Sequence, residues 1–313
     1  MVVTLTMNPA IDKSTSVLSI VPEKKLRCGE VAVEAGGGGI NVSKAFRELG
    51  GESIAVFPAG GMNGRLLKEK LGDLHIRYES IYTVSETRED FTVTEAGSGN
   101  QFRFVMPGRE LHPDEVAQCL ERIASIVPPP SIVVVSGSMP PGVPDNFVAE
   151  VASLTRQLGA RCIIDTSGMP LKLAAQEGVF MLKPNMSELC SLCETEYIEQ
   201  EDVEEAARKL IKKGHCEIMV ISMGPLGAML VTKDRTEYVS APTVKKVSAV
   251  GAGDSMTAGM VWILEQGGTL DEMVRFGVAC GTAAIMNSGT HLFKKQTAWE
   301  LFDVMNANTR LTK

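Results

Sequence analysis

The chain has 313 residues, a formal net charge of −7, 44% hydrophobic residues and 22% charged residues, a balance typical of globular proteins with one large α/β domain or two smaller ones. The acidic charge argues against general nucleic-acid binding, and no apolar run approaches the length of a membrane span. Because the first residues carry no basic segment, we expect no secretory signal and predict a cytoplasmic protein without a membrane partner.

The seven cysteines are scattered and odd in number, which predicts reduced thiols without a disulfide framework. One C-x-x-C pair, Cys190 and Cys193, lies in a predicted helix over 186–193. No second pair and no histidine at zinc-site spacing accompanies it, so packing is favoured over metal or redox chemistry.

Apolar, β-branched runs alternate with helical patterns along most of the chain, which predicts a doubly wound α/β fold with a mostly parallel central sheet. The predicted strands cover residues 2–6, 53–57, 132–136, 161–165, 180–183 and 218–222. The predicted helices cover residues 42–49, 114–126, 145–158, 203–212, 254–265 and 270–286. In such sheets ligands gather at the carboxyl ends of the strands.

Two segments break this alternation. Residues 13–35 hold short extended pieces with little helix, and residues 88–106 form a predicted hairpin whose turn contains Gly97 and Gly99. We expect the two segments to form a small β-rich lid inserted into the main domain. A lone hairpin is only marginally stable in water, so the lid is expected to pair, plausibly with a second copy of itself.

Four consecutive glycines, residues 36–39, precede Asn41 and a predicted helix. Glycine lets a polar ligand approach the backbone closely, and Asn41 can donate to and accept from a hydroxyl. A flexible linker is the alternative, but linkers do not usually lead directly into a helix. Asp12 is predicted at the carboxyl end of the first strand, either as a carboxylate that binds hydroxyls or as a turn residue.

Three basic residues, Lys25, Arg27 and Arg88, fall in the predicted lid. Exposed lysines and arginines are ordinarily solvated surface residues. Their place beside a hydroxyl-binding site makes a phosphate partner the functional alternative, because arginine suits bidentate phosphate contacts and lysine supplies a point charge.

Lys183 ends a predicted strand, and the next residues open a helix. Asn185 and Glu188, three residues apart, share one face of that helix and could orient Mg²⁺ together with water. The same pair also fits a helix cap, and the two roles are compatible.

Further along, Ser222 closes a strand, and Gly224 and Gly227 follow it. This segment predicts a turn before a strand at 228–231. The two glycines would also let the backbone approach a nucleotide.

The most informative stretch is residues 247–259, in which Gly251 and Gly253 stand just before Asp254 and an apolar helical pattern. Glycine allows successive N–H groups to point into one concavity, and a helix start adds partial positive charge. An anion hole beside a base is what phosphoryl transfer to an alcohol requires. An ordinary loop-to-helix turn capped by Asp254 is the alternative.

These motifs, in this order, resemble the ribokinase (PfkB) family of sugar kinases over nearly the whole chain. The early signature is the Gly-Gly-Gly-Gly-Ile-Asn run at 36–41, the middle one is the N-x-x-E of Asn185 and Glu188, and the late one surrounds Asp254. The resemblance implies a single ribokinase-like catalytic domain over residues 1–313, an αβα sandwich with a lid at about 13–35 and 88–106. It also implies ATP as co-substrate and Mg²⁺ as cofactor.

The resemblance implies residue roles as well. Asp254 would be the catalytic base, and the turn of Gly251, Ala252 and Gly253 would stabilise charge on the transferred phosphoryl group. Asn185 and Glu188 would hold Mg²⁺, partly through water. The other implied residues are Asp12, Gly37, Gly38 and Asn41 for the sugar, Lys25, Arg27, Arg88 and Ser138 for its phosphate, and Lys183, Asn185, Ser222, Gly224 and Gly227 for ATP.

Further stretches, at 22–27, 57–61, 104–108, 136–142 and 273–278, resemble the branch of the family that phosphorylates the C1 hydroxyl of fructose 6-phosphate in glycolysis. Sister branches acting on tagatose 6-phosphate or fructose 1-phosphate usually carry Gly-Gly-Lys-Gly at the four-glycine run, and they stay as alternatives. A non-catalytic sugar-phosphate or nucleotide sensor is less favoured because the site residues are intact. The resemblance to this branch also implies a homodimer in which the two subunits join through their lids. In that dimer, Lys25 would be donated by the neighbouring subunit.

Overall fold

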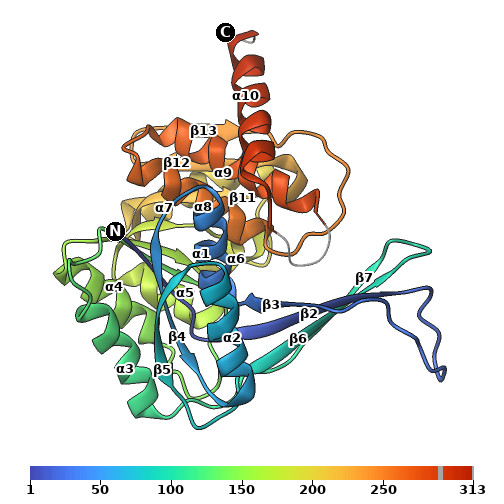
Figure 1. Cartoon of the computed structure of the whole chain (residues 1–313). Coiled ribbons are helices and arrows are strands. Elements are labelled where there is room, and N and C mark those ends of the chain that lie inside the picture. Colours follow the sequence, from blue (N-terminus) through green and yellow to red (C-terminus); the bar gives the residue numbers. More distant parts are fainter. Residues whose placement is uncertain (288–291, 312–313) are drawn as a thin grey trace.

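The computed structural model describes residues 1–287 and 292–311 and contains a nine-stranded sheet (Figure 1). The strand order is β13-β12-β11-β10-β9-β8-β1-β4-β5. Strands β11 to β5 in this order are parallel, whereas β12 and β13 pair antiparallel at one edge, so the mostly parallel sheet is confirmed. The bounds are β1 (Val2–Leu5), β4 (Ser53–Ala59), β5 (Arg77–Tyr82), β8 (Ile132–Ser136), β9 (Arg161–Asp165), β10 (Val179–Leu182), β11 (Cys216–Ser222), β12 (Ala228–Thr232) and β13 (Thr236–Val239).

Helices cover both faces of this sheet. One face packs against α3 (Pro113–Ala124), α4 (Phe147–Gln157), α5 (Gly168–Gln176), α6 (Met186–Leu192) and α7 (Val203–Lys212). The other packs against α1 (Gly38–Glu48), α8 (Ala252–Glu265), α9 (Leu270–Ile285) and α10 (Lys295–Leu311). Helix α2 (Gly61–Asp73) packs near the second sheet described below, and two short 3₁₀ turns lie at Gln200–Asp202 and Gly224–Leu226.

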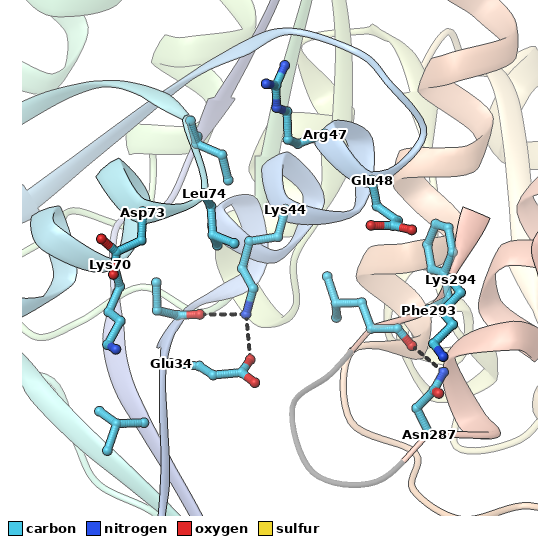
Figure 2. Close-up of a pocket in the computed structure, with 14 residues that line it drawn as sticks. Glu34, Lys44, Arg47, Glu48, Lys70, Asp73, Leu74, Asn287, Phe293 and Lys294 are labelled. Carbon is cyan, nitrogen blue, oxygen red and sulfur yellow. Dashed lines mark hydrogen bonds and ion pairs between the residues drawn. The ribbon is translucent and has the colours of Figure 1, made fainter. Parts of the chain in front are cut away.

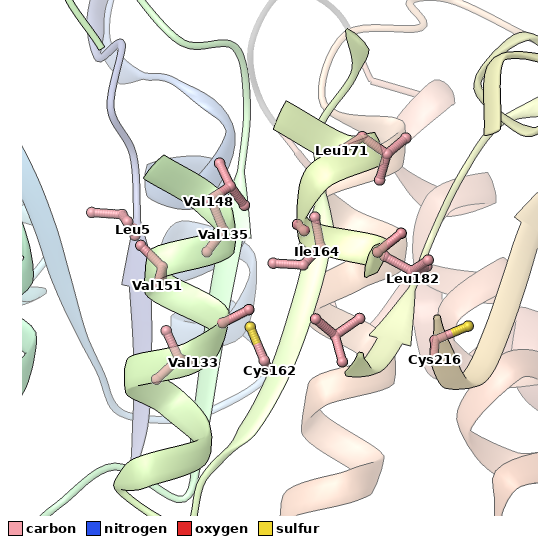
Figure 3. Close-up of a cluster of buried hydrophobic side chains, with 14 of the residues drawn as sticks. Leu5, Val133, Val135, Val148, Val151, Cys162, Ile164, Leu171, Leu182 and Cys216 are labelled. Carbon is pink, nitrogen blue, oxygen red and sulfur yellow. The ribbon is translucent and has the colours of Figure 1, made fainter. Parts of the chain in front are cut away.

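The strands are apolar on both sides because each one contributes to two cores. In β8, Val133 and Val135 join one buried cluster, whereas Ile132 and Val134 join the other. Successive side chains of a strand point to opposite faces, so a continuous apolar run fills both layers. Figure 3 shows the first cluster, where Val148 of α4 lies against the sheet residues. The result is a three-layer αβα arrangement.

A second sheet of four strands extends away from this body as a narrow ribbon (Figure 1). Its order is β3-β2-β6-β7, with bounds β2 (Ala10–Val17), β3 (Ala32–Gly36), β6 (Arg88–Glu95) and β7 (Gln101–Val105). Strand β2 pairs antiparallel with β3 and parallel with β6, and β6 pairs antiparallel with β7. The predicted β-rich insertion and its hairpin are therefore present, and the insertion begins at Ala10, earlier than residue 13.

Some helices differ from the sequence patterns. The patterns do not predict α2, α5 or α10. Helix α2 contains Gly61, Gly64 and Gly72, which lower helix propensity, and α5 has only 9 residues. Helix α1 begins at Gly38, earlier than the predicted residue 42, because Gly37 adopts a φ of 110° that serves as the turn into the helix.

Candidate active site

The carboxyl ends of neighbouring parallel strands meet the N-terminus of α8. Ser136 ends β8, Asp165 ends β9, and Thr257 of α8 donates a hydrogen bond to Asp165 at 3.0 Å. Gly251 precedes the helix in the left-handed conformation, with a φ of 71°. The first N–H groups of a helix have no acceptor within it and carry partial positive charge, so this turn can receive an anion.

Asp254 lies in the first turn of α8, and each oxygen of its carboxylate accepts one hydrogen bond from another element. Asn41 Nδ2 of α1 donates to Oδ2 at 3.0 Å, and Ser136 Oγ of β8 donates to Oδ1 at 3.2 Å. The fold thus brings Asp254 and Asn41 together, although 213 positions separate them. The carboxylate stands beside the anion-accepting turn.

Burial is the largest influence on the pKa of Asp254, and with the nearby Asp165 it raises that pKa from 3.8 to about 6. The hydrogen bonds from Asn41 and Ser136 and the charge of Lys183 act in the opposite direction. An acid with a pKa near 6 is ionised at neutral pH and is a stronger base than an ordinary aspartate.

Lys183 follows β10 and forms a buried ion pair with Asp165, with Nζ 3.0 Å from Oδ1. A Cβ placed on Gly253 would lie 3.6 Å from Lys183 Nζ, which puts the ammonium group beside the turn of α8. Burial lowers the pKa of Lys183, but the charge and hydrogen bond of Asp165 outweigh it and raise the pKa overall. A permanent positive charge therefore lies next to the turn.

Asn185 and Glu188 form the reciprocal cap of α6 that the sequence predicts. Asn185 Oδ1 accepts from the Glu188 N–H at 2.9 Å, and Glu188 Oε2 accepts from the Asn185 N–H at 2.8 Å. Burial raises the pKa of Glu188, and Asp165 raises it further. Each oxygen retains a lone pair, and oxygen donors of this kind suit Mg²⁺, so the pair fits the cation that the sequence predicts.

The four-glycine run packs closely against the carboxyl ends of β1 and β8. A Cβ on Gly38 would lie 2.5 Å from Ser136 Oγ, and one on Gly39 would lie 2.6 Å from Thr6 Oγ1. Only glycine leaves room for this contact. Asn41 Oδ1 is buried and has no hydrogen-bond partner among the described residues, so it can accept from a ligand hydroxyl.

Asp12 does not lie at the position that the sequence pattern predicts. It belongs to β2 of the second sheet, opposite Asp90 of β6, and not to the carboxyl end of β1. The apolar start of β2 is short, so the pattern around Asp12 resembles a turn after β1. Burial, the largest influence, together with Asp90 raises the pKa of Asp12 to about 6, against the opposing charges of Lys44 and Arg88.

Arg88 and Ser138 meet through Asn8. The guanidinium of Arg88 donates to the Asn8 carbonyl at 3.2 Å and pairs with Asp90 at 2.8 Å, and Asn8 Nδ2 donates to Ser138 Oγ at 3.1 Å. Arg88, Asn8 and Ser138 lie at the root of the second sheet, which is the end that joins the main body. Asp12 is on β2, the strand adjacent to β6, which carries Arg88.

Lys25 and Arg27 are not brought to this site within one chain. They are exposed and belong to the connection between β2 and β3, residues 18–31. That connection lies at the far end of the second sheet from α8 (Figure 1).

The predicted turn is present: Ser222 ends β11, Gly224 begins the 3₁₀ turn after it, and Gly227 directly follows that turn. The backbones of Asn185 and Ser222 form an isolated parallel β-bridge, which joins this turn to the cap of α6. Gly227 has a φ of 104°, and a Cβ there would collide with the Val239 carbonyl, so glycine is required.

A cavity of about 890 Å³ lies elsewhere, between β3, α1, α2 and the residues just before α10 (Figure 2). Lys44 lines it and binds Glu34 and the Ala35 carbonyl, each at 2.9 Å. None of its described lining residues is a predicted site residue, so its volume does not mark the site at α8.

Two residues of the site, Ser136 and Asp165, escape the sequence analysis. Each is the polar residue that ends an apolar strand whose carboxyl end faces the site. That position is the signal that could have identified them. Cys190 of α6 and Cys193, the residue after that helix, are free and half-buried and pack against the core.

Within residues 1–287 and 292–311, no helix is long and apolar enough to cross a membrane. The same residues contain no group of three or more His, Cys, Asp or Glu side chains that could hold a metal ion by themselves. A cation at Asn185 and Glu188 would therefore need ligands from elsewhere, such as water and a bound phosphate.

The model of the pfkB family of carbohydrate kinases matches residues 1–297. The ATP-dependent 6-phosphofructokinase isozyme 2 of Escherichia coli (strain K12) is 42% identical over 290 residues, 92% of this chain and 94% of that one. The protein of the same name from Mycobacterium tuberculosis (strain CDC 1551 / Oshkosh) is 39% identical over 303 residues, 97% of this chain and 89% of that one.

Solved structures agree with this relationship. Phosphofructokinase-2 from Escherichia coli in complex with fructose-6-phosphate matches with a TM-score of 0.91 and 39% identity, covering 97% of this chain and 99% of that one. The tetrameric inhibited form of the same protein matches with the same values. The chain therefore belongs to the pfkB family of carbohydrate kinases, and its fold is the ribokinase-like αβα sandwich.

Proposed function

We propose that this kinase is an ATP-dependent 6-phosphofructokinase that transfers the γ-phosphoryl group of ATP to the C1 hydroxyl of fructose 6-phosphate. The single observation that carries the proposal is Asp254, held by Asn41 and Ser136 beside the N-terminus of α8. The names of relatives about 40% identical over nine-tenths of the chain supply the sugar. The product, fructose 1,6-bisphosphate, places the reaction in glycolysis, and we expect the enzyme in the cytoplasm.

In this proposal the oxygen of the sugar's C1 hydroxyl attacks the γ-phosphorus of ATP, and Asp254 accepts the proton of that hydroxyl. The bond between the γ-phosphorus and the bridging oxygen breaks, and this oxygen leaves with ADP. The N–H groups of Ala252, Gly253 and Asp254 stabilise the charge on the transferred group. Lys183, fixed by Asp165, adds a positive charge beside the same turn. Catalysis then depends on positioning and charge neutralisation.

Asn185 and Glu188 would hold Mg²⁺, partly through water, because both present side-chain oxygens at the start of α6. When bound, the cation would neutralise charge on the nucleotide phosphates. Ser222, Gly224 and Gly227 would line the ATP site next to this pair, since Asn185 bridges to Ser222.

The sugar would lie between α1 and the root of the second sheet. Asn41 would accept from a sugar hydroxyl through Oδ1, for which residues 1–287 and 292–311 supply no partner, and Asp12 would bind another hydroxyl. Gly37 and Gly38 would allow close approach of the sugar to the backbone. Arg88 and Ser138, joined through Asn8, would bind the 6-phosphate.

Residues 1–313 would form one catalytic domain whose lid comprises about 13–35 and 88–106. The lid exposes Phe102, Phe104 and Val105 of the edge strand β7, with exposed fractions of 39%, 50% and 60%. We propose that two copies join through their lids, which would bury these side chains and bring Lys25 and Arg27 to the partner's sugar phosphate.

A coupled assay with ATP and Mg²⁺ tests the function, comparing kcat/KM for fructose 6-phosphate, tagatose 6-phosphate and fructose 1-phosphate. The proposal predicts a clear preference for fructose 6-phosphate. Preference for another sugar phosphate would contradict the proposed substrate but leave the proposed kinase chemistry in place. Binding of ATP without turnover of any of the three would favour a non-catalytic sensor.

A further inference from the structure

Ser136 is the last residue of β8, and the residue as a whole is only 2% exposed. Its hydroxyl donates to Asp254 Oδ1, while Asn41 donates to the other oxygen. The torsion that rotates an aspartate carboxylate is intrinsically soft, so a free carboxylate would sample many orientations. Two donors from two separate elements restrict that rotation.

We infer that Ser136 is a positioning residue for the base: its hydroxyl orients the Asp254 carboxylate and favours the charged form. The inference rests on the proposed function, since it requires Asp254 to accept the proton of the sugar. A hydrogen bond donated to the ionised form of an acid stabilises that form. Ser136 does this from the end of β8, and it acts through Asp254.

The glycine at position 38 makes this contact possible. A Cβ there would lie 2.5 Å from Ser136 Oγ and 2.5 Å from the Gly137 nitrogen, both too close for any side chain. Gly38 therefore serves the base as well as the sugar: it leaves the space that the Ser136 hydroxyl occupies. This links the four-glycine run to the chemistry at α8.

Among the described residues, the charged groups that face Asp254 are Asp165 at the end of β9 and Lys183 after β10. Burial and then Asp165 raise the pKa of Asp254, whereas Asn41, Lys183 and Ser136 oppose them. Loss of the Ser136 hydroxyl removes one opposing influence. The pKa of Asp254 is then expected to rise. As the pH is lowered, the variant should therefore lose activity sooner, at a higher pH, than the wild type.

The test is the pH dependence of kcat/KM for fructose 6-phosphate in wild type, Ser136→Ala and Ser136→Thr. In Ser136→Ala we expect the acid limb of the pH profile to move up by about one pH unit, with roughly fivefold lower kcat/KM near pH 6 and a smaller loss near pH 9. Ser136→Thr keeps the hydroxyl and should return the limb toward the wild type. Asp12 and the substrate phosphate titrate in every variant, so a difference between variants belongs to Asp254.

Ser131→Ala is the matched control, because it removes a hydroxyl near the opposite end of β8, where Ser131 binds Met1. It should leave the acid limb in place. Ser136→Cys keeps nearly the volume of serine with a weak donor, and it should behave like Ser136→Ala even if the alanine variant packs poorly.

Two results would overturn the inference alone: acid limbs of Ser136→Ala and Ser136→Cys that coincide with the wild type, or a loss equal at every pH that Ser136→Thr does not restore. Asp254→Asn separates these from a failure of the proposed function. If Asp254→Asn turned over like the wild type, the base role and this inference would both fail.

Discussion

At Asp254 the requirements of folding and of the proposed catalysis oppose each other. Burial and Asp165 raise the pKa of this carboxyl from 3.8 to about 6. The folded protein therefore binds the proton more tightly than the unfolded chain between about pH 4 and pH 6. Protonated Asp254 therefore contributes to the free energy of unfolding fully below about pH 4, and this contribution is lost as the pH rises through 6. The ionised base that the proposed reaction needs is thus a cost to the fold at neutral pH.

The residue-scale prediction is that Asp254→Asn is more stable than the wild type near pH 8, by about 1–3 kcal/mol, because asparagine cannot ionise. Near pH 4 the two proteins should unfold at similar temperatures. Thermal unfolding of both proteins at the two pH values measures this difference. A variant that is less stable than the wild type near pH 8 would show that hydrogen bonds outweigh the cost of the buried charge.

Single residues were predictable where they stand in a dense local motif. Gly251, Gly253 and Asp254 form such a motif. Ser136 and Asp165 do not, because one polar residue after an apolar run resembles any strand end. They come together only through the parallel pairing of β8 and β9, which places the two residues opposite each other at the carboxyl ends of neighbouring central strands.

At the scale of elements, the start of α8 depends on a backbone conformation that favours glycine. Gly251 has a φ of 71°, and a Cβ there would collide with Leu292. Gly267, just beyond the other end of α8, has a φ of 73°, and a Cβ there would meet no atom of the part of the chain that the structure describes within 4 Å. The two glycines share the same backbone strain on substitution but differ in their surroundings.

We predict that Gly251→Ala lowers kcat by about 10²-fold, because a displaced helix start misplaces the anion-binding N–H groups. Gly267→Ala should lose comparable stability, about 1–2 kcal/mol, with kcat near the wild-type value. Steady-state kinetics and thermal unfolding of both variants measure these effects. Equal losses of kcat in the two variants would mean that the Gly251 turn has no special role.

The second sheet shows what local patterns leave out. The β6–β7 hairpin has a short turn and was predictable from alternation and glycines. The pairing of β2 with β6 joins distant segments in parallel, and nothing local specifies it. The predicted position of Asp12 was wrong for this reason, because its true position depends on its partner strand.

At the scale of the whole molecule, Lys25 lies in the connection between β2 and β3, at the far end of the second sheet from α8, which carries Asp254 (Figure 1). The proposed dimer would bring Lys25 of one copy to the site of the other. Subunits carrying Lys25→Ala and subunits carrying Asp254→Asn should each be nearly inactive alone. Mixed by co-expression or by unfolding and refolding together, they should recover about a quarter of wild-type activity, since half of randomly paired dimers hold one intact site.

The matched control for this mixture is a double variant, Lys25→Ala with Asp254→Asn in the same chain, mixed with Asp254→Asn. No dimer of that pair holds an intact site, so no activity should return. Absence of recovery in the first mixture, with dimers present by light scattering, would place Lys25 in its own subunit's site or outside any site.

The central claim is that Asp254 is the base of a fructose 6-phosphate kinase, and its most direct test is kcat for wild type and Asp254→Asn with saturating fructose 6-phosphate, ATP and Mg²⁺ near pH 8. We predict turnover by the wild type and a loss of about 10²–10⁴-fold in the variant, with KM little changed and the fold intact. A variant whose kcat stays within about threefold of the wild type would contradict the account.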